Sequence, residues 1–296
     1  MAKKLLIVFL CFVLLGSFFV SEGRKVSASN KKVKIKGVPE YHQFPQLPTG
    51  CEATSLAMLL SWGGEDFGKY EVVDKLPKGD KVRLIDGELK GANPNKEFVG
   101  NPYSDEGSFG VFEGPILETI DKFMPGKGVD LTGQSFDSLL DIVRSGKPVM
   151  AWTTIEQRQT FHSATWTDDE GNEIKWNRFE HAVVITGIDG ENVIVNDPYT
   201  GQEVYYNREL FEKNWASMGK RAVTLDVSTS AELVNLSGKD GKVEKKKSLL
   251  EIENGVNMFT NAVGKIFTEI EIIRYYPTNF SKLWKPFSYF MPQENT

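Results

Sequence analysis

The sequence predicts an α+β fold, in which one helix carries a cysteine and an antiparallel β-sheet follows later in the chain. A helical apolar pattern covers residues 51–62, and Gly63-Gly64 ends it. Far downstream, the apolar runs 181–188 and 192–195 flank the dipeptide Asp189-Gly190, a pattern typical of a β-hairpin. A helix followed by hairpin-connected strands favours the α+β class.

The other elements are shorter. Residues 135–145 have the pattern of a short amphipathic helix, and residues 148–152 form a compact apolar run typical of a buried strand. Two more strands are predicted at 203–206 and 221–227. Residues 80–114 are rich in Gly, Asn and Pro, which indicates a long ordered loop or short irregular elements.

The N-terminal segment has the pattern of an export signal. Lys3-Lys4 precede an apolar run over 5–20, and Val26-Ser27-Ala28 resembles a small-residue cleavage site. We therefore expect residues 1–28 to be a secretory signal peptide that directs the protein to the cell envelope or the extracellular space. The alternative is an uncleaved signal anchor. No second long apolar run follows residue 28.

The C-terminal part changes in composition. Residues 227–248 are rich in Ser, Gly, Asp and Lys, which is typical of a linker. Residues 249–296 begin with apolar residues spaced three and four apart, which predicts a long amphipathic helix as an extension. Such a helix either packs on its own domain or forms a coiled-coil dimer. The oligomeric state is left open.

The bulk composition excludes some classes of function. The 296 residues carry a formal net charge of −5, with 40% apolar and 25% charged residues. An acidic chain of this kind is not expected to bind nucleic acid. We also predict no metal and no cofactor, because the cysteine and the histidines lack the spacing of a ligand motif.

Cys51 is the main candidate for chemistry. Once residues 1–28 are removed, it is the only cysteine left, so no intramolecular disulfide can form. Thr49 and Glu52 have the spacing of a capping box, which would place Cys51 in the first turn of the helix. Unpaired amides and the helix dipole favour a thiolate there and are expected to lower the thiol pKa. Cys51 is therefore predicted to be a nucleophile; a small buried core residue is the alternative.

A cysteine nucleophile needs a base and a group that orients the base. Of the three histidines, His181 opens the strongest apolar strand. His42 lies on the loop nine residues before Cys51, and His162 lies in the polar segment 153–180. Asp197 follows the second strand of the hairpin, which returns the chain to the end where His181 lies. We therefore expect Asp197 to reach the His181 ring. Asn196 is the alternative orienter, although its side chain should point to the other face.

Stabilisation of a tetrahedral intermediate needs preorganised hydrogen-bond donors. The amide of Cys51 is one candidate. Gln43 and Gln46 lie just upstream in the chain and could supply a side-chain amide. Surface glutamines are common, so only the closeness of Cys51 makes these two candidates.

These residues resemble a known family. A glutamine, then a cysteine at a helix start, then a histidine and an acid or amide on successive strands is the order found in papain-like cysteine peptidases. The local motifs are similar to the standalone branch of cysteine peptidase family thirty-nine, best known for bacteriocin-processing enzymes that cut after double-glycine leaders. The matching segments are Val38–Gln43, Pro48–Glu52, Ser55–Met58, Gly91–Tyr103, Gly107–Gly110 and Asn196–Pro198.

The resemblance covers residues 37–226 and implies a papain-like domain. In it, Cys51 would be the nucleophile, His181 the general base and acid, Asp197 the orienter, and Gln43 the oxyanion donor. The expected function is an exported, cysteine-type peptidase that acts on a peptide or protein substrate through an acyl-enzyme. The alternatives are a non-catalytic binding module on the same scaffold and a thiol acyltransferase or amidase that acts on envelope peptides. Glu52 stands where the transporter-linked members have glycine, so cleavage after double glycine does not carry over.

Overall fold

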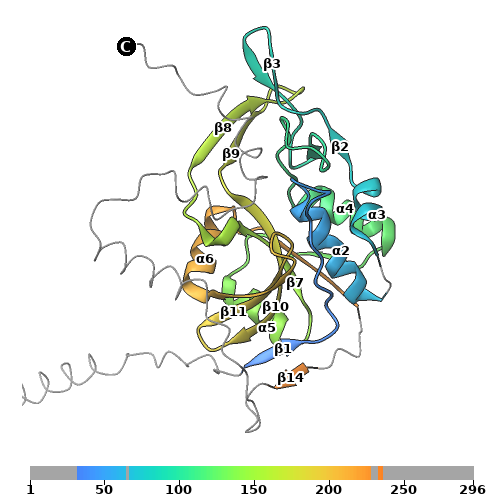
Figure 1. Ribbon diagram of the computed structural model, residues 1–296, viewed down its shortest axis with the longest axis vertical. Helices are drawn as coiled ribbons and strands as arrows, with labels where there is room; N and C mark the ends of the chain where they lie inside the picture. The colour runs from blue at the N-terminus through green and yellow to red at the C-terminus, as the bar shows by residue number, and fades with distance from the viewer. Residues whose placement is uncertain (1–31, 65–66, 228–232, 236–296) are drawn as a thin grey trace, which may run out of the picture. The chain divides into compact units, whose positions relative to one another are not determined.

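The computed structural model describes residues 32–64, 67–227 and 233–235 (Figure 1). The predicted signal peptide at 1–28 and the predicted helical extension at 249–296 lie outside these residues.

The predicted linker 227–248 is described only in part. Within it, Leu233–Asn235 forms strand β14, which pairs antiparallel with β1 (Val33–Ile35), so this part belongs to a sheet. None of the helices in the described part of the chain combines the length and the apolar composition needed to cross a bilayer.

The predicted α+β class is confirmed, with Cys51 on a helix that packs against an antiparallel sheet. The larger sheet has the strand order β12-β11-β10-β7-β13-β6, and β1 pairs with β10 and β14. All of the strand pairs described in this sheet are antiparallel. Besides β1 and β14, its strands are β6 (Gly128–Asp130), β7 (Val149–Thr154), β10 (Glu180–Asp189), β11 (Asn192–Asp197), β12 (Gln202–Asn207) and β13 (Ala222–Leu225).

Helices cover both faces of the central strands. Every residue of β7 is buried, and so is nearly every residue of β10, as expected for strands with packed side chains on both sides. Figure 1 shows α2, α3 and α4 on one side of these strands and α6 on the other. The helices are α2 (Cys51–Gly63), α3 (Lys69–Lys75), α4 (Glu113–Phe123), α5 (Phe136–Arg144) and α6 (Arg208–Ser217).

Helix α2 is nearly all buried, and this explains its sequence. Its small residues and its leucines fill the core, and Gly64 follows its last residue as predicted. Ser55 donates a hydrogen bond to the carbonyl of Ala182 in β10, at 2.9 Å. This bond ties the first turns of α2 to the start of β10.

Two smaller sheets complete the described chain. The segment 80–114 contains short strands rather than a bare loop. The polar segment 153–180, for which the sequence predicts no strand, contains the hairpin of β8 and β9, which packs Trp166 and Trp176 on its buried face. These sheets comprise β2 (Lys78–Gly79) with β5 (Phe98–Val99), and β3 (Arg83–Ile85), β4 (Glu88–Lys90), β8 (His162–Thr167) and β9 (Glu173–Asn177). A 3₁₀ turn, η1 (Ile155–Gln157), precedes β8.

The close approach of β1 to β10 depends on Gly187. The register of β10 against β11 shifts between Ile185 and Gly187, and a Cβ on Gly187 would lie 2.5 Å from the carbonyl oxygen of Val33. We expect Gly187→Ala to destabilise the protein by about 1–3 kcal/mol, because the backbone of β1 would have to shift. Urea denaturation measures the change. Gly68→Ala is the control, since Gly68 has φ −78° and only a flexible carboxylate nearby. Equal stability of the Gly187 variant and the wild type would contradict the expectation.

Candidate active site

His181 and Asp197 meet at one end of the β10–β11 hairpin. The Nε2 atom of His181 lies 2.7 Å from Oδ1 of Asp197, and both side chains are almost fully buried. The contact expected from the sequence is therefore present. An ionised carboxylate only accepts hydrogen bonds, so Nε2 carries the proton. In the neutral ring, Nδ1 is then the acceptor.

Asp197 is held by more than the histidine. The hydroxyl of Tyr206 donates to Oδ2 at 2.7 Å, and the amide of Tyr199 donates to Oδ1 at 2.8 Å. Burial by itself would raise the pKa of Asp197, but the His181 charge and the three hydrogen bonds outweigh it and leave this pKa below its ordinary value. The ring of Tyr199 packs edge-on against His181, with 6.0 Å between centroids. The imidazole is thus fixed from two sides.

Cys51 is the first residue of α2 and faces the start of β10. Gly50 is the N-cap residue. Cys51 lies one turn before Ser55, on the same side of the helix, and Ser55 is bonded to Ala182, the neighbour of His181. Cys51 and His181 both line a pocket of about 160 Å³. The fold therefore brings the predicted nucleophile and the predicted base to one cavity.

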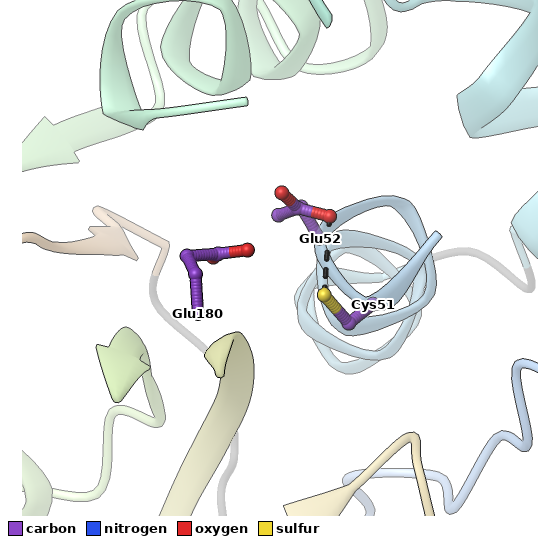
Figure 2. Close-up of side chains that lie close together, drawn as sticks. All are labelled: Cys51, Glu52 and Glu180. Carbon is purple, nitrogen blue, oxygen red and sulfur yellow. Dashed lines mark hydrogen bonds between the residues drawn. The ribbon is translucent and has the colours of Figure 1, made fainter. Parts of the chain in front are cut away.

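The thiol is turned toward two carboxyl groups (Figure 2). Its sulfur donates to Oε2 of Glu52 at 3.2 Å, and no hydrogen bond in the described part of the chain joins it to the His181 ring. The sulfur of Cys51 and one carboxyl oxygen each of Glu52 and Glu180 all lie within 4.8 Å of one another.

Burial, followed by the charges of Glu52 and Glu180, raises the pKa of the Cys51 thiol well above its ordinary value, although the amide of Ala182 acts in the opposite direction. The expectation of a lowered thiol pKa is wrong for this arrangement.

The predicted capping box is also wrong. Helix α2 has no side-chain cap. Thr49 donates instead to the carbonyl of Ser104, at 3.0 Å. Glu52 accepts the amide of Val111 at 2.7 Å and is fully buried. Thr49 and Glu52 have the spacing of a capping box, but both side chains form their hydrogen bonds with loops from distant parts of the chain.

Gly110 explains how two carboxyl groups fit beside the thiol. A Cβ on Gly110 would lie 2.2 Å from Oε1 of Glu52 and 3.2 Å from Oε2 of Glu180.

Burial raises the pKa of Glu52 to about 7, although the amides of Val111 and of Glu52 itself, the thiol and His181 lower it. Burial and the Glu52 charge raise the pKa of Glu180 as well, against the effect of Arg221. Both carboxyl groups therefore hold their protons more tightly than exposed glutamates do.

The same three side chains are also possible metal ligands. A thiolate and two carboxylates can bind a divalent cation such as Zn²⁺. The sequence pattern did not reveal this group, because Glu180 lies far from Cys51 and Glu52 in the chain. A metal ion held there would occupy the sulfur that is predicted to attack.

Gln43 lines the same pocket, but its donors point elsewhere. Its amide nitrogen donates to the carbonyls of Leu47 and Pro48, at 3.1 and 3.3 Å, and its Oε1 is buried without a partner. The backbone amide of Gln43 bonds to the carbonyl of Pro198, which follows Asp197. Gln46 accepts a hydrogen bond from Lys69 and does not line this pocket. Of the two glutamines, Gln43 is therefore the one near Cys51.

The remaining polar candidates lie away from the thiol. His42 is exposed, with Nε2 at 3.2 Å from the carbonyl of Tyr199. His162 is exposed on β8 and contacts Thr165. Asn196 donates to the carbonyls of Val38 and Pro39, on the face opposite Asp197, as the alternation of β11 requires.

Sequence reasoning missed four residues of this site. Glu180 precedes His181 directly, and only the folded chain shows that it lines the pocket beside Cys51. Tyr206 lies on β12, and only the pairing of β12 with β11 brings it close to Asp197. Arg158 and Arg178 lie in the polar segment that was not recognised as a hairpin, and they also line the pocket.

The chain is similar to known proteins in sequence and in fold. Residues 35–223 match the model of the peptidase C39-like family. The chain is 34% identical over 214 residues to the uncharacterized protein YvpB of Bacillus subtilis (strain 168), covering 70% of this chain and 84% of that protein. A crystal structure named as a "putative C39-like peptidase" from Bacillus anthracis superposes with a TM-score of 0.61 at 35% identity, covering 68% of this chain and 100% of the other. The family model spans the helix that begins at Cys51 and the strands that carry His181 and Asp197. The chain therefore belongs to the peptidase C39-like family.

Proposed function

We propose that the protein is a cysteine peptidase that hydrolyses peptide bonds through Cys51, His181 and Asp197. One observation carries the proposal: Cys51 and a His181 ring anchored on Asp197 line the same pocket. A thiol and an imidazole at one cavity are the two groups that acyl transfer by cysteine requires. Membership of a peptidase-like family supports the same reaction class.

The reaction begins with a proton transfer. Rotation of the Cys51 side chain away from Glu52 brings the sulfur toward Nδ1 of His181, which accepts the thiol proton. The thiolate attacks the peptide carbonyl, and Asp197 stabilises the imidazolium that forms. His181 then donates the proton to the leaving amine, and a thioester remains on Cys51. Water, deprotonated by His181, hydrolyses the thioester and restores the thiol.

The oxyanion needs donors near the sulfur. The amide of Cys51 belongs to the first turn of α2, where amides have no acceptor within the helix. Gln43 is the proposed second donor. For that role, its amide must exchange the longer bond to the carbonyl of Pro48 for one to the substrate.

The test compares the wild type with Cys51→Ala on a mixture of peptides. Mass spectrometry should show new peptide ends with the wild type and none with the variant. A far-ultraviolet circular dichroism spectrum checks that the variant is folded. No cleavage by the wild type at any pH between 5 and 9 would contradict the proposal.

The thiol arrangement also favours a second candidate, a peptide-binding module without turnover. The bond from Cys51 to Glu52 and the raised thiol pKa both hold the sulfur in its unreactive form. This candidate predicts peptide affinity that Cys51→Ser leaves unchanged, and no cleavage. A thiol acyltransferase would use the same thioester, and a ligated product in the presence of an added amine identifies it.

We also propose that the protein is exported and acts on peptides at the cell envelope. The support is the charged, apolar and small-residue order of residues 1–28. N-terminal sequencing of the protein from the culture medium or the envelope fraction is expected to begin after Ala28. An intact Met1 in cytoplasmic fractions only would contradict it.

A further inference from the structure

One carboxyl oxygen of Glu180 is buried without a hydrogen-bond partner. This atom, Oε1, has no partner in the part of the chain that the structure describes. Arg221 acts on Glu180 through its charge, but it forms its ion pair with Glu113. Buried carboxylates in proteins are normally paired with a cation or bound to a metal, because desolvation without a partner is unfavourable. The unpartnered oxygen of Glu180 therefore points to a bound cation.

The carboxyl group of Glu180 points toward Glu52 and Cys51 (Figure 2). The sulfur and one oxygen of each carboxyl group all lie within 4.8 Å of one another. In a tetrahedral zinc site, a sulfur at about 2.3 Å and an oxygen at about 2.1 Å from the ion lie about 3.6 Å apart. The sulfur of Cys51 already lies 3.2 Å from Oε2 of Glu52. The distances from the Glu180 oxygen to these two atoms must shorten by at most about 1.2 Å.

The backbone of Val111 fixes the orientation of Glu52. Its amide donates to Oε1 of Glu52 at 2.7 Å, whereas Oε2 contacts the sulfur. The carbonyl of Val111 accepts a hydrogen bond from the indole of Trp152 at 2.9 Å, and Trp152 is fully buried in β7. Carboxylates that bind metals are held by hydrogen bonds of this kind, which orient them toward the ion. Glu52 is thus positioned as a ligand by the core of the protein.

The site also has room for an ion and a way in. Gly110 has no side chain, and a Cβ there would lie 2.2 Å from Glu52 and 3.2 Å from Glu180. Cys51 and Glu180 both line the pocket of about 160 Å³. An ion can therefore reach the three side chains through this pocket, as a metal site requires.

The chemistry of the donors selects the metal. Mg²⁺ and Ca²⁺ bind oxygen donors, whereas a thiolate is a soft ligand that favours zinc. One sulfur and two carboxylate oxygens suit Zn²⁺, and three protein ligands leave a fourth position for water. Three anions away from water repel one another, and a divalent cation among them offsets this repulsion.

We propose that Cys51, Glu52 and Glu180 form a Zn²⁺ site, and that the bound ion holds the peptidase in an inactive state. Binding forms a zinc–sulfur bond and breaks the S–H bond of the thiol, whose proton passes to the solvent. No electron is transferred. The ion keeps the sulfur on the side of Glu52, so it cannot turn to His181 and attack a substrate. The inhibition rests on the proposed function, whereas the metal site does not.

Absorption spectroscopy with Co²⁺ tests the site without a substrate. Co²⁺ can replace Zn²⁺, and its bond to a thiolate gives a charge-transfer band in the near ultraviolet. The full chain carries Cys11→Ser in this experiment, so that Cys51 is the only thiol. One equivalent of Co²⁺ should give the band, and Zn²⁺ should remove it by competition, whereas Mg²⁺ and Ca²⁺ should not. The Cys51→Ser variant should give no band. Absence of the band in the folded parent protein overturns the site.

Substitution of each carboxylate identifies the other ligands. Glu52→Gln and Glu180→Gln should each weaken Zn²⁺ binding by at least about 100-fold, since loss of a group that merely orients a ligand costs 10- to 100-fold. Glu118→Gln removes a carboxylate outside the pocket and should bind as the parent does. His181→Ala should also keep its affinity, which distinguishes this site from a cysteine–histidine metal site. Circular dichroism checks that each variant is folded. Parent affinity in either pocket glutamine variant overturns the site, and so does an equal loss in His181→Ala.

Peptide cleavage tests the inhibition separately. If the protein cleaves a peptide in the presence of a chelator, Zn²⁺ should stop cleavage at the concentration that displaces Co²⁺, and excess chelator should restore it. Glu180→Gln, compared with its own rate in chelator, should need at least about 100-fold more Zn²⁺. Cleavage that continues when the site is saturated with Zn²⁺ overturns the inhibition. A Co²⁺ band without cleavage in chelator leaves the metal site standing and contradicts the peptidase proposal, and the inhibition with it.

Discussion

Asp197→Ala is expected to lower the rate of Cys51-dependent peptide hydrolysis by about 10²- to 10⁴-fold, the range that general acid–base catalysis supplies. Without Asp197, no carboxylate selects the His181 tautomer with the proton on Nε2, and none stabilises the imidazolium. The hydroxyl of Tyr206 and the amide of Tyr199 also lose their acceptor. The measurement is kcat/KM on a peptide that the wild type cleaves, with the alkylation rate of Cys51 as a second readout.

Asp197→Asn is the matched control. Its Oδ1 can still accept from His181 and Tyr199, and its amide nitrogen can donate to Tyr206. The geometry is thereby kept and the negative charge is removed. We expect a smaller loss than with alanine, because the ring keeps its hydrogen-bond partner and only the carboxylate charge is removed. A purely structural role would lower the amount of folded enzyme and leave kcat/KM per folded molecule unchanged. Wild-type rates in Asp197→Ala would exclude Asp197 from the reaction.

Glu52→Gln is expected to stabilise the protein at pH 8 by about 3 kcal/mol relative to the wild type and to leave its stability at pH 4 nearly unchanged. Burial raises the Glu52 pKa from 4.5 to about 7. Below 4.5, the carboxyl is protonated in the folded and unfolded states alike. Between pH 4.5 and about pH 7, the unfolded state ionises first, so the wild type loses stability as the pH rises. At about 1.4 kcal/mol per pH unit, this loss of stability comes to about 3 kcal/mol.

Glutamine keeps the oxygen that accepts the amide of Val111, so the change isolates the ionisation. Urea denaturation at pH 4, 6 and 8 measures it. Glu118→Gln, on the exposed part of α4, is the control for the loss of a surface carboxylate. The ionisation of Asp197 does not affect this comparison, because its lowered pKa changes the stability only at more acidic pH.

The same substitution should change the chemistry of Cys51. Removal of the Glu52 charge lowers the thiol pKa, so iodoacetamide should react with Cys51 at lower pH in the variant. Glu180→Gln should act in the same direction, since its charge also raises the thiol pKa. Identical pH profiles for wild type and both variants would show that the two carboxyls do not control the sulfur.

Local patterns predicted several elements well. The apolar run from Cys51 to the two glycines became α2, and the runs around Asp189-Gly190 became the β10–β11 hairpin. The contact between His181 and Asp197 followed from the hairpin alone, because two paired strands bring their distal ends together. Such predictions succeed where the deciding interactions lie within a short stretch of chain.

Predictions failed where distant segments compete for a side chain. Glu52 has the spacing of a capping box, yet the amide of Val111, fifty-nine residues away, binds its carboxylate. The hairpin of β8 and β9 is not predicted, because its segment is mostly polar and its buried face is completed by Phe109 and Phe112 from a distant part of the chain. Arg158 and Arg178 reach the pocket only because this hairpin folds back on the sheet.

The sequence by itself determined the α+β class, the helix that begins at Cys51 and the strands that carry His181 and Asp197, because periodicity and turn chemistry act within a few residues of each other. Only the tertiary structure decided the state of the thiol. Its pKa depends on burial and on Glu52 and Glu180, and Glu180 comes to the sulfur through the packing of β10 against α2. Desolvation and charge act through space, so the chain order does not reveal them.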